Sequence, residues 1–109
     1  MPSYLVQASY TSESIASLIK TPQDRGEVVR KSVEKLGGKL VGGWLSFGDY
    51  DVVLIAELPD HVSAAAIAMA AAAGGSLKGI KTTPLLTFEE GLAAAKKAAG
   101  SGYVPVKKH

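Results

Sequence analysis

The sequence contains no cysteine, which excludes disulfide cross-links, thiolate metal sites and a cysteine nucleophile. Its 109 residues leave room for one domain, and so small a domain must depend on packing, helped by self-association. Net charge is nearly absent, since 12 Lys and Arg face 10 Asp and Glu, so no polyanionic partner such as nucleic acid is indicated. With 47% hydrophobic and only 20% charged residues, the chain is too apolar for a disordered segment and should fold.

Targeting and membrane-spanning segments are lacking as well. Residues 1–4 show no basic stretch followed by an apolar one. The longest run of small apolar residues, 64–73, falls well short of the ~20 residues that a bilayer span needs. We therefore expect a soluble cytoplasmic protein with no membrane partner.

The pattern of apolar residues and turn signals predicts four strands and three helices. Strands are expected at 3–10, 39–47 and 51–58 and within 77–88, and helices at 21–36, 60–73 and 89–99. Thr21 and Pro22 supply a hydroxyl cap and a first-turn proline for the first helix, whereas residues 12–19 could form only a short helical turn. Residues 100–109 are expected to be a flexible tail, or an arm that orders on a neighbouring subunit.

Each predicted helix has a recognisable end or apolar face. In the first, Val29, Val33 and Leu36 form one buried stripe, and a glycine pair at 37–38 ends the helix. The second is alanine-rich, with Ile67 and Met69 as its main large fillers. In the third, residues 87–90 have the pattern of a capping box.

The order of elements is strand, helix, strand, strand, helix, strand, followed by one more helix. This order is that of the ferredoxin-like βαββαβ arrangement. We therefore predict an α+β protein with a four-stranded antiparallel sheet and helices on one face, in a single domain over residues 1–99. The first and third strands would be central, and the fourth strand, which contains Pro84, would lie at an edge where a missing N–H is tolerated.

A hairpin between the second and third strands sets the predicted register. Gly48 and Asp49 indicate a two-residue type II′ turn, because glycine takes the positive φ that this turn requires. Counting outward from the turn places Trp44 opposite Val53.

The same register leaves one apolar face of the sheet without a cover. Two helices can cover only one face, and the other face would carry Trp44, Val53, Ile55 and Leu40. An exposed apolar patch of this kind indicates an interface or a ligand groove. We expect a second copy of the chain to pack its sheet on this face, in a homodimer or a larger homo-oligomer.

The hairpin also carries a family resemblance. Residues 47–53 read FGDYDVV, preceded by LGGKL at 36–40 and followed by ELPD at 57–60. This pattern resembles the GYD domain family, named for a Gly-x-Tyr-Asp hairpin motif that Gly48, Tyr50 and Asp51 match, and the resemblance extends over about residues 3–90. It implies a ferredoxin-like fold of the dimeric α/β-barrel kind and supplies no catalytic residues.

Four residues near the hairpin end of the uncovered face are candidates for binding a small molecule: Gln7, Trp44, Ser46 and Asp51. An amide, an indole, a hydroxyl and an acid around an apolar cavity can orient a small organic ligand. The structural alternative is that Asp51 caps the hairpin or meets a cation of the second copy, while Trp44 packs in an interface. No catalytic residue, cofactor or metal site is predicted, and His61 and His109 are expected to be solvent residues.

Three classes of function remain open. The first is a non-enzymatic module that binds a small molecule or serves assembly through the uncovered sheet face. The second is a cofactor-independent oxygenase or isomerase acting on a small organic substrate, an idea that rests on analogy with other dimeric α/β barrels. RNA binding comes last, because the third strand offers Asp51 and Glu57 among aliphatic residues where RNA readers need stacking aromatics and basic groups.

Overall fold

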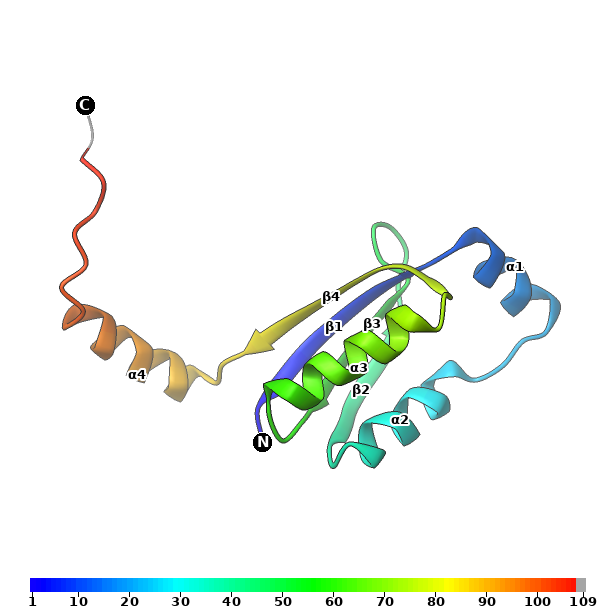
Figure 1. The fold of residues 1–109 in the computed structure, drawn as a ribbon, viewed down its shortest axis with the longest axis horizontal. Helices are drawn as coiled ribbons and strands as arrows, with labels where there is room; N and C mark the ends of the chain where they lie inside the picture. The colour runs from blue at the N-terminus through cyan, green and yellow to red at the C-terminus, as the bar shows by residue number, and fades with distance from the viewer. Residues whose placement is uncertain (108–109) are drawn as a thin grey trace.

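A computed structural model describes residues 1–107 as a four-stranded antiparallel sheet with α2 and α3 on one face (Figure 1). The elements in chain order are β1 (Ser3–Tyr10), α1 (Ser12–Lys20), α2 (Arg25–Lys35), β2 (Lys39–Leu45), β3 (Val52–Glu57), α3 (His61–Ala73), β4 (Leu77–Leu85) and α4 (Phe88–Ala99). The strand order is β2-β3-β1-β4, which confirms that β1 and β3 are central and that Pro84 lies on an edge strand. None of the helices within residues 1–107 combines the length and the apolar composition needed to cross a membrane.

The hydrophobic core lies between the sheet and the two helices on its face. Its buried members come from the central strands, from the residue that follows β3 and from one position on each helix: Tyr4, Val6, Ala56, Leu58, Val33 and Ala64. Val29 and Leu36 pack against this cluster, which confirms the predicted stripe on α2. On α3, Ile67 packs against the cluster, but the prediction for Met69 is wrong, since this side chain is 71% exposed. Two residues along a helix is more than half a turn, so Met69 faces away when Ile67 faces the sheet.

Two helices join β1 to β2, where one was predicted. The hydroxyl of Thr11 accepts an N–H of the first turn of α1, so residues 12–20 form a full helix rather than a short turn. The predicted helix start at Thr21 and Pro22 is wrong, because α2 begins at Arg25 and the carboxylate of Asp24 caps it. The proline therefore belongs to the connection between the two helices.

The β2–β3 hairpin has the predicted register but not the predicted turn. Trp44 lies opposite Val53, as counting from the loop predicted. The two strands end at Leu45 and begin at Val52, so residues 46–51 form a loop that the Ser46 N–H closes by donating to the Asp51 carbonyl (2.9 Å). Gly48 does take a positive φ, 124°, which favours glycine.

A bulge at Val41 places Leu40 on the face opposite to the predicted one. The register shifts between Leu40 and Gly42, so Leu40 pairs with Ala56 and lies among the buried residues on the helix side. The prediction of Leu40 on the uncovered face is therefore wrong. One extra residue in a strand moves every side chain beyond it to the other face.

The helix α4 projects from the end of β4 away from the sheet (Figure 1). Its capping box is formed as predicted, since Thr87 Oγ1 accepts the Glu90 N–H (3.0 Å) and Glu90 Oε1 accepts the Thr87 N–H (2.9 Å). The projection makes the chain extended, with a radius of gyration of 17.5 Å. A compact chain of this length has about 13 Å.

Candidate functional site

The sheet face opposite α2 and α3, here called the open face, carries two rows of residues across β1, β3 and β2. The rows are Gln7, Val53 and Trp44, and then Leu5, Ile55 and Gly42. Trp44 is 57% exposed. Its indole lies over Gly42, where a Cβ would come within 2.8 Å of the ring. The glycine thus lets the indole lie against its own strand. The open face is apolar at Leu5, Val53, Ile55 and Trp44, whereas β4 adds Lys81 and Thr83 beside these rows.

Three hydrogen bonds fasten the hairpin loop to β1. The Tyr10 N–H donates to Asp51 Oδ2 (2.8 Å), and the Asp51 N–H donates to the Ala8 carbonyl (2.8 Å). The hydroxyl of Ser9, a buried residue, donates to the Asp49 carbonyl (2.6 Å). The bond from Tyr10 has the Asp51 carboxylate as its acceptor, and hydrogen bonds to charged groups are among the stronger ones in proteins. The aspartate of the Gly-x-Tyr-Asp motif thus joins the loop to a central strand.

The structure brings two of the four predicted ligand residues into one row, since Gln7 and Trp44 flank Val53 on the open face. The other two lie at the loop, and their polar side-chain atoms bond to backbone. Ser46 Oγ donates to the Tyr50 carbonyl (2.7 Å), and the Asp51 carboxylate accepts from β1. The ligand-binding role of the four residues stays a prediction, as does its structural alternative.

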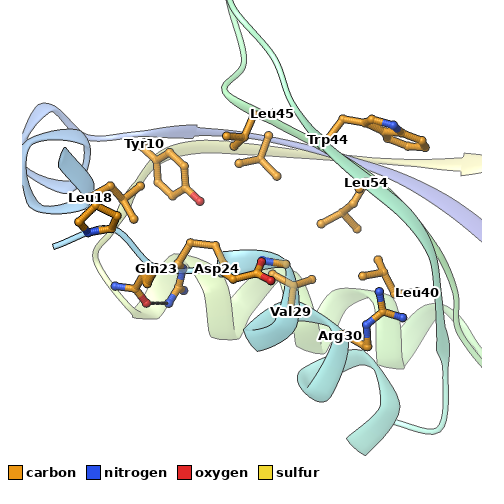
Figure 2. Close-up of a pocket in the computed structure, with 15 residues that line it drawn as sticks. Tyr10, Leu18, Gln23, Asp24, Val29, Arg30, Leu40, Trp44, Leu45 and Leu54 are labelled. Carbon is orange, nitrogen blue, oxygen red and sulfur yellow. Dashed lines mark hydrogen bonds between the residues drawn. The ribbon is translucent and has the colours of Figure 1, made fainter.

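A cavity of about 460 Å³ lies on the other side of the sheet (Figure 2). This helix-side cavity is lined by the α1–α2 connection, α2 and the hairpin strands, through Tyr10, Leu18, residues 22–26, Val29, Arg30, Leu40, residues 43–45, Val52 and Leu54. In Figure 2 the ring of Tyr10 points into this space, whereas the ring of Trp44 points away from it toward the open face. Sequence reasoning missed the cavity, although the glycine pair at 42–43 within a strand is a signal of missing side chains.

The polar groups around the helix-side cavity are mostly basic or already bonded. The Asp24 carboxylate accepts the Gly26 N–H (3.0 Å) as the cap of α2. Arg25 Nη1 donates to Gln23 Oε1 (3.2 Å). Arg30 lies beside the cavity on the next turn of α2. The helical period alone assigns both arginines to solvent, and no sequence pattern indicates that they lie beside one cavity.

A polar contact between Tyr4 and His61 joins the core to the start of α3. Tyr4, only 1% exposed, has its hydroxyl 2.7 Å from Nδ1 of His61, with the two rings edge-on. His61 is exposed, as predicted, but it also serves as the partner of a buried hydroxyl. Asp60, the residue before His61, has a lowered pKa. The main cause is the hydrogen bond from the Ser63 backbone N–H, followed by that from the Ser63 hydroxyl, and His61 adds to the effect. His109 lies outside the described residues.

Comparison with known proteins adds a family and one relative. Residues 4–95 match the model of the GYD domain. A protein of Thermus thermophilus named "Glutamine synthetase and cystathionine beta-lyase binding protein" is 28% identical over 78 residues, which cover 72% of this chain and 82% of that protein. No solved structure matches the chain.

Proposed function

Because this chain belongs to the GYD domain family, we propose that it is a binding module that acts through protein–protein contacts on its open face. The observation that carries this proposal is the placement of Trp44, a 57% exposed indole on a sheet face that α2 and α3 leave uncovered. Val53 and Ile55 continue this apolar surface on the neighbouring central strand. Aromatic residues of this kind are typical of the centres of protein interfaces.

The first partner is a second copy of the chain. The chain exposes 8160 Å², whereas a compact monomer of this mass exposes about 5,700 Å². A standard interface removes about 800 Å² from each partner. The excess includes the exposed helix α4 as well as the open face, so both surfaces are available to a second copy. Packing the two open faces together would give the dimeric α/β barrel that the family resemblance implies.

The helix α4 offers a further surface to the assembly. Phe88 is fully exposed and Leu92, one turn later on the same side, is 57% exposed. A helix of this length is marginal in water without packing. Only Leu86 and Thr87 separate α4 from β4, and the capping box fixes the start of the helix. An arm of this kind would pack on a neighbouring subunit and could extend a dimer into a larger homo-oligomer.

The name of the Thermus thermophilus relative, which describes binding to two enzymes, supports protein partners for the assembled module too. No observation among the described residues favours the alternative of a cofactor-independent oxygenase or isomerase. Two of the four candidate residues, Ser46 and Asp51, already use their polar side-chain atoms in bonds to backbone.

Light scattering of the wild-type chain and of two matched variants tests the proposal. Trp44→Glu places a charge on the open face, whereas Leu45→Glu changes the next residue of the same strand, which is 76% exposed on the opposite face. We expect a wild-type mass of at least twice 11.3 kDa, a monomeric Trp44→Glu variant with unchanged circular dichroism, and an unchanged mass for Leu45→Glu. A monomeric wild-type chain, or a Trp44→Glu variant that keeps the wild-type mass, would refute the proposal.

A further inference from the structure

The helix-side cavity has the size and the apolar walls of a small-molecule site. Its volume of about 460 Å³ lies within the ~300–1,000 Å³ of typical ligand pockets. Leu40 and Leu54 form part of its wall on the sheet, and Val29 faces them from α2. Val33 is the buried residue of α2, so this helix packs closely on the sheet near its end and leaves space beside its first turns.

Gly43 keeps this cavity open. It lies opposite Leu54 on β2, on the cavity side of the sheet. A Cβ at this position would meet Leu54 Cβ at 3.6 Å, an ordinary contact, and the φ angle of Gly43 is not positive. Neither the backbone nor the neighbours therefore require glycine here. The consequence of the missing side chain is the empty space in front of Leu54.

The charges around the cavity favour an anion. Arg25 and Arg30 both line it, and the one lining carboxylate, Asp24, is directed to the first turn of α2. The ion pair of Arg30 with Glu27 is loose and exposed, with Nε and Oε2 3.7 Å apart. Guanidinium groups bind carboxylates and related oxyanions with paired hydrogen bonds.

We propose that the helix-side cavity binds a small amphipathic anion, an aliphatic or aromatic molecule with one carboxylate or sulfonate group. The apolar body would pack against Leu40 and Leu54, and the anionic group would contact Arg25 and Arg30. The Tyr10 ring, which points into the cavity, adds a hydroxyl to the polar end (Figure 2). This site is on the opposite side of the sheet from the open face and does not depend on the proposed self-association.

The test is a fluorescence titration of the full chain with 8-anilinonaphthalene-1-sulfonate, in competition with decanoate. Gly43→Val fills the cavity, and Gly79→Val is the matched control, because Gly79 lies on a strand with nothing within 4 Å of an added Cβ. We expect saturable binding of one dye per chain and displacement by decanoate. Gly43→Val should weaken dye binding about tenfold or more, and Gly79→Val should not change it.

A second variant keeps the proposal testable if Gly43→Val fails to fold. Replacing Arg25 and Arg30 by glutamine should weaken binding of the sulfonate dye about fivefold and leave the uncharged analogue N-phenyl-1-naphthylamine unchanged. Binding that is not saturable, that is equal in a folded Gly43→Val chain, or that loses both dyes equally in the arginine variant would overturn the proposal. Each of these outcomes is independent of whether the chain is a dimer.

Discussion

The hydrogen bond between the Asp51 carboxylate and the Tyr10 N–H makes Asp51→Ala the most informative single change in the motif. The donor and acceptor are 2.8 Å apart and partly buried, and the two residues are 41 positions apart in sequence. Tyr10 pairs with Leu77 on β4 after a register shift, but it lies beyond the last β1–β3 pair, Ala8 with Val52, so the Asp51 carboxylate accepts its N–H on that side. A hydrogen bond to a charged group contributes about 1.5–3 kcal/mol. We therefore expect Asp51→Ala to lower the free energy of unfolding by about 2 kcal/mol.

Urea denaturation followed by circular dichroism measures this loss. With a denaturant dependence of about 1–3 kcal/mol per M, the midpoint should fall by about 1 M. Asp51→Asn should lose roughly half as much, because its amide oxygen still accepts from Tyr10 but carries no charge. All chains must be compared at one protein concentration, because self-association adds to the apparent stability.

Asp49→Ala is the matched control, since Ser9 bonds to the backbone carbonyl of Asp49 and not to its carboxylate. This variant should stay within about 0.5 kcal/mol of the wild-type chain. The reasoning would be refuted if Asp51→Ala were equally neutral, or if Asp51→Asn were as destabilising as Asp51→Ala. Faster hydrogen exchange of the Tyr10 amide in Asp51→Ala alone would identify the lost bond directly.

Three other changes test separate parts of the fold. Tyr4→Phe removes the bond to His61 and should lower the free energy of unfolding by about 1 kcal/mol in urea denaturation. Gly38→Ala should cost about 2 kcal/mol or more in the same assay, because its Cβ would overlap the β3 backbone, whereas Gly79→Ala should be nearly neutral. The pKa of Asp60 is lower in the folded chain than in the unfolded chain. Its ionised carboxylate therefore adds to the free energy of unfolding above the unfolded-chain pKa, and this contribution is lost as the pH falls through the folded-chain pKa. The free energy of unfolding should therefore fall less steeply with decreasing pH in Asp60→Asn than in the wild-type chain.

Features that depend on residues close in sequence could be predicted. The stripe of α2 follows from the helical period, and Val33 is its most buried member. Gly37 ends that helix with a φ of 83°, a conformation that favours glycine. The capping box between Thr87 and Glu90 is formed by two residues of one turn. Each of these elements has its cause within a few positions along the chain.

Features that depend on distant contacts could not be predicted. The hairpin loop is wider than a two-residue turn because Asp51 bonds to β1, and nothing near the loop in sequence indicates that partner. The bulge at Val41 likewise reversed the predicted face of Leu40. In the candidate site, the register placed Gln7 and Trp44 on one face, but the helix-side cavity depends on how α2 lies over the sheet. A helical period predicts which face of a helix is apolar and not how closely each turn packs.

The strand β3 contributes to both proposed binding surfaces through alternate residues. Val53 points to the open face beside Trp44, whereas Leu54 points into the helix-side cavity beside Gly43. Because successive side chains of a strand point to opposite faces, a partner and a ligand would contact different residues of the same strand. Val53→Glu changes an open-face residue that does not line the cavity, so it should abolish self-association and leave dye binding intact, and Gly43→Val should do the reverse. Loss of both properties in either folded variant would show that the two faces are coupled through the sheet, which would contradict the assignment of separate sites.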